Sequence, residues 1–190
     1  HFFSKEGWEK LVDIATKTLE LFHKQFPLRQ GISREELRNK LSLSQGSFNS
    51  VIGLLEGKKS LRESNSLILL YDHKPELSEE QSQYAEKFVG DITEGRFSPR
   101  TDLEIDDDIL NFLLEKGRLV KVADGIVFSS EIFDEMLSGL RDYISQNDEI
   151  TVGDFRDLYQ TSRKYALAVL DYLDQQQITR RVGDARVLRD

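Results

Sequence analysis

Residues 112–128 read FLLEKGRLVKVADGIVF, and this stretch joins the end of a helix to a β-hairpin. Its first half carries apolar residues at helical spacing as far as Leu114. Its second half places Asp124-Gly125 between two short apolar runs, which is a strong signal for a two-residue hairpin turn. The stretch therefore predicts a helix followed at once by two antiparallel strands.

The same pattern occurs three times along the chain. Residues 53–70 (GLLEGKKSLRESNSLILL) and residues 171–188 (DYLDQQQITRRVGDARVL) align with it without gaps. The anchoring leucines Leu55, Leu114 and Leu173 are 59 residues apart in both intervals. Such a fixed period indicates one supersecondary unit used repeatedly.

Further helices are predicted before each of these stretches. Apolar residues at i, i+3, i+4 and i+7 between residues 8–22, 84–92 and 132–144 predict a long helix with one buried face in each copy. A capping box, Ser33 to Glu36, predicts a short second helix in the first copy, and Thr151 to Asp154 is a weaker version in the third. In the middle copy Pro99 indicates that this helix is shortened or absent.

Three helices and a hairpin over about 60 residues are typical of the winged helix. The sequence therefore predicts a mainly α fold with small β-hairpins (α+β), made of three tandem winged-helix domains. We expect these at residues 1–74, 75–128 (with the shortened or missing second helix) and 129–190, joined by short linkers near HKPELS and FSSE. Because the first residue is His1 and not Met, we expect a piece of a longer chain.

Composition excludes several classes of protein. The 190 residues contain no cysteine, which rules out disulfide frameworks and thiolate metal sites and favours an intracellular setting. The longest aliphatic run, Leu67 to Leu70, is too short to span a bilayer. The histidines, His1, His23 and His73, lack zinc-site spacing, and His23 is expected at the surface or its boundary. No nucleophile–base arrangement can be argued from spacing, so we expect this chain not to be an enzyme.

Positive charge gathers at the two ends of a chain whose net charge is −8. Lysine and arginine exceed aspartate and glutamate by two in residues 1–73 and again in residues 161–190. In residues 74–128 and 129–160 the acidic residues exceed the basic ones by six each. Because screening acts over about 8 Å at physiological salt, a polyanion responds to the local patch rather than to the net charge.

The start of the third helix in each copy separates a nucleic-acid reader from a non-reader, because helix starts favour anions. In the middle copy it begins at Asp106, Asp107 and Asp108, which would repel phosphate. In the first copy it begins near Ser44 and is neutral, which leaves that copy undecided. In the last copy Thr161 or Ser162 is the expected cap, and two cations follow it where acidic residues are usual. The candidate RNA-binding residues are Ser162, Arg163, Lys164, Arg180, Arg181, Arg186 and Arg189.

A structural explanation of these arginines remains open. They could form a solvated face and pair with Asp154, Asp157 or Asp184. Tyr165 could stack on a base, but its spacing from Val169 favours a place at the edge of the core.

Two stretches resemble a known family. HKQFPLRQGISREELRNKL (residues 23–41) and TSRKYALAVLDYLDQQQITRRVGDARVLRD (residues 161–190) are similar to the C-terminal extension of bacterial selenocysteine-specific elongation factors. The resemblance covers most of the chain and is weak in the middle copy.

The resemblance implies a specific function. Factors of this family deliver selenocysteinyl-tRNA to the ribosome at in-frame UGA codons, and their last winged helix binds a messenger RNA hairpin, the selenocysteine insertion sequence. It also implies a cytoplasmic protein, and GTP and magnesium bound in an N-terminal part that is absent here. No GxxxxGK[ST] motif is present, so we expect no cofactor in this fragment. We expect a monomer that uses no membrane, with the acidic units acting as a spacer.

Two other functions remain open from the residues alone. Tandem winged helices also serve as protein-docking scaffolds, in which case the terminal arginines would meet an acidic protein. They also serve as DNA-binding transcription factors. Without the resemblance, the residues do not distinguish RNA from DNA.

Overall fold

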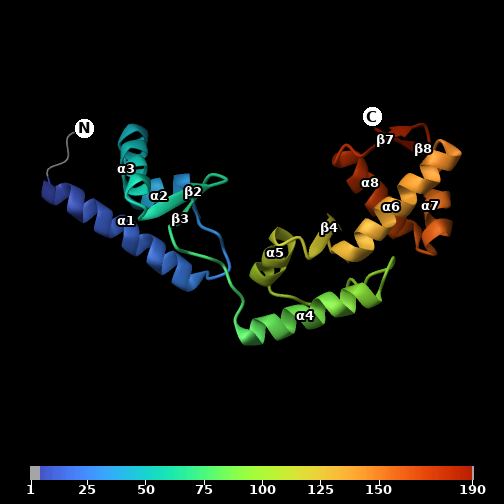
Figure 1. Ribbon diagram of the computed structural model, residues 1–190, viewed down its shortest axis with the longest axis horizontal. Coiled ribbons are helices and arrows are strands. Elements are labelled where there is room, and N and C mark those ends of the chain that lie inside the picture. The colour runs from blue at the N-terminus through green and yellow to red at the C-terminus, as the bar shows by residue number, and fades with distance from the viewer. Residues whose placement is uncertain (1–4, 190) are drawn as a thin grey trace. The chain divides into compact units, whose positions relative to one another are not determined.

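The computed structural model describes residues 5–189, and contacts divide the chain after Ser78 into two compact units (Figure 1). Three helix-plus-hairpin units follow one another along the chain, consistent with tandem winged helices, and we call them the first, middle and last units. The first lies before Ser78, and the middle and last share the second compact unit. Their boundaries at 74/75 and 128/129 stay predictions, and the predicted ends at residues 1 and 190 lie outside the described residues.

The first unit has the expected order of elements. A three-stranded antiparallel sheet, with strand order β1-β3-β2, lies beside its helices. The elements are α1 (Lys5–Gln25), β1 (Ile32–Ser33), α2 (Arg34–Lys40), α3 (Gln45–Gly57), β2 (Leu61–Ser64) and β3 (Leu67–Leu70).

The second compact unit contains the other two copies of the pattern. The middle unit consists of α4 (Glu79–Glu94), α5 (Asp107–Glu115), β4 (Leu119–Ala123) and β5 (Ile126–Ser129). The last unit consists of α6 (Ser130–Asn147), β6 (Ile150–Thr151), α7 (Val152–Tyr159), α8 (Arg163–Gln175), β7 (Thr179–Val182) and β8 (Ala185–Leu188), with strand order β6-β8-β7. Among residues 5–189, no helix has the length and hydropathy that crossing a bilayer requires.

Capping residues start the short second helices as expected. The complete capping box, however, is in the last unit and not in the first. The Thr151 side chain accepts from the backbone N–H of Asp154, whose carboxylate accepts from the backbone N–H of Thr151, so this capping box is complete. In the first unit Ser33 accepts from the backbone N–H of Glu36 at 3.2 Å, and Glu36 itself pairs with Lys40. The stronger box is therefore in the last unit, contrary to prediction.

Each third helix enters its hairpin through the same backbone turn. A left-handed residue follows the C-cap each time: Lys59 (φ 55°), Gly117 (φ 66°) and Gln177 (φ 59°). The carbonyl three residues before each C-cap, of Leu55, Leu113 and Leu173, accepts from the residue that precedes the hairpin. The middle equivalent of Leu55 is thus the buried Leu113, one residue before the Leu114 of the gap-free alignment.

The middle unit departs from the pattern between its helices. Residues 95–106, which the structure describes throughout, form turns and an irregular loop and contain no helix. A Cβ at Gly95 would lie 2.8 Å from the Cα of Pro99, so the turn there requires glycine. At the other end of the unit, β5 ends at Ser129 and α6 begins at Ser130. The linker expected at FSSE is therefore replaced by direct continuation of strand into helix.

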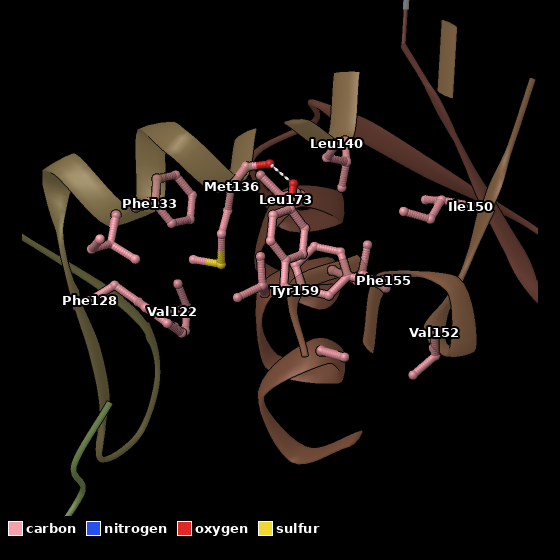
Figure 2. Packing of buried hydrophobic residues seen from close by; sticks show 14 of the residues in the cluster. Val122, Phe128, Phe133, Met136, Leu140, Ile150, Val152, Phe155, Tyr159 and Leu173 are labelled. Carbon is pink, nitrogen blue, oxygen red and sulfur yellow. Dashed lines mark hydrogen bonds between the residues drawn. The ribbon is translucent and has the colours of Figure 1, made fainter. Parts of the chain in front are cut away.

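The middle and last units share one hydrophobic core (Figure 2). Val122 and Phe128 of the middle hairpin join Phe133 and Met136 of α6, and α7 and α8 contribute Phe155, Tyr159 and Leu173 to the same cluster. Phe128, Phe155 and Leu173 are fully buried. Burying large apolar side chains contributes about 1.5–3 kcal/mol each, so this common core holds the two units together.

His23 is buried, contrary to the expectation of a surface or boundary position. Its side chain stacks on His73 with ring centroids 3.5 Å apart, and its Nε2 accepts from the backbone N–H of Leu70 at 3.3 Å. Burial, and secondarily the charge of His73, lower the pKa of His23 to about 4. The periodicity of α1 placed this residue on the edge of the apolar face but did not reveal the hairpin and the second histidine that cover it.

The buried histidine predicts a pH dependence for the first unit. Because the pKa of His23 falls from 6.5 in the unfolded chain to about 4 when folded, the unfolded state binds more protons between these values. The neutral His23 therefore contributes to the free energy of unfolding in full above about pH 6.5. This contribution, on the order of 3 kcal/mol, is lost as the pH falls toward 4. Fluorescence of Trp8, the single tryptophan, during urea unfolding checks this. His23→Gln, which keeps an acceptor for Leu70, should flatten the dependence, and an unchanged curve would contradict the assignment.

Candidate nucleic-acid interface

The start of α8 presents two cations and lacks the usual side-chain cap. Ser162 is the N-cap residue but makes no side-chain capping hydrogen bond, and no acidic residue lies in the first turn. Arg163 and Lys164 are exposed. Each cation at the positive end of a helix costs about 0.3–1 kcal/mol in the absence of an anion. In this geometry the first amides and the two side chains are available together.

The hairpin formed by β7 and β8 supplies further arginines. Arg180 and Arg181 are exposed on β7, and Arg181 is opposite Arg186 across the strand pair. The turn contains Gly183 at φ 62°, a conformation that favours glycine. The Arg181 side chain donates to the carbonyl of Gly183 at 2.9 Å, which holds it along the tip of the hairpin.

A groove of about 410 Å³ lies between the start of α7, α8 and the hairpin. It brings Arg163 and Arg181 together from different elements, with Leu167 as an apolar wall. Asp171 and Asp184 also line it, and Asp184 lies 3.8 Å from Arg181. Exposed ion pairs of this length contribute little, so Arg181 can exchange this partner for a phosphate at small cost.

Arg186 also lines this groove, but it is buried and its charge is paired within the last unit. Its side chain is 2% exposed, and its guanidinium donates to Asp171 at 2.7 Å and to Asp174 at 3.2 Å. The neutralised side chain supports the sheet from inside the unit. We therefore propose a structural role for Arg186 in place of the predicted RNA contact.

The other candidate residues lie around the groove rather than in it. Lys164 lies with its Nζ 5.5 Å from the ring centroid of Tyr165. Arg180 is exposed on β7, and Arg189 is exposed just beyond β8, where its backbone N–H donates to Ile178. These three side chains are candidate cations of the last unit that do not line the groove.

The structural explanation of the arginines holds only in part. Asp154 is committed to the capping box, and Asp157 pairs with the neighbouring Arg156. Only Asp184, of the three partners considered, approaches a candidate arginine. The carboxylates that do neutralise an arginine, Asp171 and Asp174, belong to α8.

Val182 and Thr151 are interface candidates that the charge pattern did not indicate. Val182, at the end of β7, is 44% exposed although it is apolar. Thr151, the N-cap of α7, lines the groove beside Arg163 and Arg181. The half-buried place of Thr151 at the edge of the β6-β8-β7 sheet could not be read from the sequence.

The corresponding groove of the first unit is neutralised internally. It measures about 340 Å³ and is lined by Arg34, Glu35, Arg38, Gln45 and Phe48. Gln45 and Glu63 occupy the positions, 118 residues earlier, of Arg163 and Arg181. Glu63 forms an ion pair with Arg34, which also donates to Asn49 at 2.7 Å. The first unit thus has no cation at the two positions that Arg163 and Arg181 occupy in the last.

The middle unit presents acidic residues at the equivalent helix start. Asp106 is the N-cap of α5 and accepts from the backbone N–H groups of Asp108 and Ile109. Asp107 and Asp108 follow in the first turn. This arrangement satisfies the helix start with carboxylates and excludes phosphate. No catalytic domain is evident in residues 5–189.

Family comparisons match both ends of the chain. Models described as "Elongation factor SelB, winged helix" match residues 16–70 and residues 142–188. The selenocysteine-specific elongation factor of Desulfomicrobium baculatum is 30% identical over 204 residues, covering 99% of this chain and 32% of the relative. That of Escherichia coli K12 is 28% identical over 186 residues, covering 91% and 30%. The chain thus spans about a third of the length of these relatives.

Two solved structures are similar to this chain. The crystal structure of bacterial selenocysteine-specific elongation factor EF-Sec covers 99% of this chain with 31% of its own, at TM-score 0.57 and 19% identity, which shows the fold alone. The structure of the mRNA-binding domain of elongation factor SelB from E. coli in complex with SECIS RNA covers 60% of this chain and 100% of that one, at TM-score 0.47 and 25% identity.

Proposed function

This chain is homologous to the C-terminal winged-helix region of the selenocysteine-specific elongation factors, and from this premise we propose that its last unit binds the SECIS hairpin of a messenger RNA. SECIS RNA is the ligand named for the E. coli mRNA-binding domain. The observation that carries the proposal is the convergence of Arg163 and Arg181 on one groove beside an uncapped helix start.

The chemistry of the site suits one compact RNA. Arg163, Lys164, Arg180 and Arg181 supply phosphate contacts, and Arg189 and the Ser162 hydroxyl lie at the margins. Phosphate contacts fix the position of the RNA but do not read its sequence. Sequence recognition in RNA depends on contacts to unstacked bases. Exposed Val182 at the hairpin tip offers an apolar surface to such a base. A single basic unit fits one hairpin better than a two-fold DNA operator.

The similarity to the elongation factors supports a proposal for the wider role. We propose that the full-length protein carries selenocysteinyl-tRNA to the ribosome at UGA codons in the cytoplasm, using GTP and magnesium in a part that this chain does not contain. In that assembly the chain is not itself an enzyme. Its last unit would hold the factor on the message, and we expect it to act as a monomer.

Binding competition tests the proposed ligand. At low salt we expect the protein to bind a SECIS hairpin more tightly than a length-matched duplex RNA or duplex DNA, because only the hairpin exposes unstacked bases. Fluorescence anisotropy with labelled hairpin and unlabelled competitors measures this. Equal or tighter binding of duplex DNA would support a transcription factor, and no binding of any nucleic acid would support a protein-docking scaffold.

A further inference from the structure

The start of α8 is held by the middle unit rather than by its own cap. In the other two units a side chain at the N-cap closes the third helix: Ser44 accepts from the backbone N–H of Ser47, and Asp106 accepts from two backbone N–H groups. Ser162 does not do this. A helix start without a side-chain cap loses about 0.5–2 kcal/mol of support, so another contact must define where α8 begins.

Thr161, just before Ser162, and Tyr165, three residues after it, make that contact. The hydroxyl of Thr161 donates to the backbone carbonyl of Phe97 at 2.6 Å and lies 2.9 Å from the hydroxyl of Ser98. The hydroxyl of Tyr165, one helical turn later, donates to the carbonyl of Pro99 at 2.8 Å. Phe97, Ser98 and Pro99 of the middle unit thus hold the residue before the cap of α8 and a residue in its first turn.

The docking segment is the loop that replaces the missing second helix. Residues 95–100 fold back on themselves: the N–H of Ser98 donates to Gly95 at 2.9 Å, and Gly95 permits the close approach of Pro99. Phe97 then packs against Tyr159 with ring centroids 4.9 Å apart. The Tyr159 hydroxyl in turn donates to Met136 at 2.6 Å within the shared core (Figure 2). The loop is therefore anchored to the same core as α8.

This contact fixes the helix start on the side away from the groove. Thr161 is 8% exposed, while Ser162, Arg163 and Lys164 are all exposed. The hydrogen bonds of Thr161 and Tyr165 leave the two cations free for a ligand and limit the movement of the turn that carries them. Ligand groups held in place before binding lose less freedom on binding.

We propose that Thr161 and Tyr165 are positioning residues for RNA binding, and that the Phe97–Pro99 segment of the middle unit is part of the reading apparatus rather than a spacer. The inference rests on the proposed function of the last unit. It assigns no RNA contact to the middle unit, whose effect passes through the first turn of α8.

Removal of single hydroxyls tests the proposal. Thr161→Val keeps the shape of the side chain and removes its donor, and Tyr165→Phe does the same at the second point. We expect each variant to bind the SECIS hairpin about fivefold to tenfold more weakly, and the pair about 30-fold, within the range of measured couplings between sites. The salt dependence of binding should keep its slope, because no phosphate contact is removed. Thr161→Ser should restore the affinity.

A matched control separates positioning from simple loss of stability. Thr93 lies in α4 of the same compact unit and donates its hydroxyl to Val89 at 2.7 Å. Thr93→Val removes a comparable bond far in sequence from α8 and should leave RNA affinity within twofold. All affinities are measured at 15 °C on variants shown by thermal unfolding to be folded there. A Thr161→Val protein that melts earlier but binds hairpin like the wild type would overturn the proposal.

Hydrogen exchange provides a second readout that needs no RNA. The amide of Ala166 donates to Ser162 and forms the first bond of the helical ladder. We expect the amides of Ala166, Leu167 and Ala168 to exchange at least about fivefold faster in Thr161→Val, and at the wild-type rate in Thr93→Val. Unchanged exchange in Thr161→Val would refute positioning. If Thr161→Val exchanges faster but the wild-type protein binds no hairpin, the structural role of Thr161 is retained and the proposed function is refuted instead.

Discussion

Replacing both Arg163 and Lys164 with alanine is expected to weaken binding of the SECIS hairpin by about 100-fold or more. Charge-assisted hydrogen bonds contribute about 1.5–3 kcal/mol each, and each 1.4 kcal/mol is a factor of ten in affinity. The same change should leave the protein as stable as before or slightly more so, because it removes two cations from the positive end of α8. Anisotropy titration and urea unfolding measure the two effects on the same preparation.

A matched charge removal in the first unit is the control for this double variant. Lys58 and Lys59 are exposed at the end of α3, and replacing both with alanine removes the same net charge. The groove of that unit is neutralised by Arg34 and Glu63, so we expect hairpin affinity within about twofold of the wild type. Equal losses in the two double variants would show that affinity follows net charge and not the last unit.

Arg186→Ala is expected to destabilise the second compact unit by about 3 kcal/mol. The substitution leaves the carboxylate of Asp174, which is 24% exposed, without its cation and removes a side chain that is almost fully enclosed. Breaking a buried pair by removing one partner typically costs about 3–5 kcal/mol, and partial exposure of the aspartates places this case at the lower end. Urea unfolding followed by far-ultraviolet circular dichroism measures the change.

Arg181→Ala is the control on the opposite strand. Arg181 lies opposite Arg186 in the register of β7 and β8. Its side chain, however, is 61% exposed, and its ion pair with Asp184 is long. We expect less than about 0.5 kcal/mol of destabilisation and a clear loss of RNA affinity. Arg186→Ala with wild-type stability would mean that the arginine is not structural, and the role proposed for it would be wrong.

The repeat in the sequence predicted the winged-helix pattern because its signals are local. Asp124-Gly125 and Gly183-Asp184 form their turns within a few residues, and the aspartates begin α5 as expected, with Asp106 as its cap. The alignment was one residue out in the middle unit. α3 ends two residues after Leu55, whereas α5 ends only one residue after Leu114. A gap-free comparison cannot detect such a shift, because Leu113 and Leu114 are both apolar.

The errors concern residues whose partners are distant in sequence. Arg186 was assigned to the surface by its charge, yet the repeat aligned it with Ile68 and Val127, which are buried in their own hairpins. That alignment was a usable signal for burial. The docking of residues 97–99 on Thr161 and Tyr165 spans more than 60 positions and left no periodic trace. His23 likewise required the knowledge that His73 and β3 cover it.

The salt dependence of hairpin binding tests the central claim most directly, because its slope counts the phosphates that protein cations neutralise. For the wild type we predict that log affinity falls with log salt with a slope of several units. For Arg163→Ala with Lys164→Ala the slope should be shallower by about one to two units, at about 0.7–0.9 per lost contact. Identical slopes for the two proteins would contradict the account, since the cations at the start of α8 would then touch no phosphate.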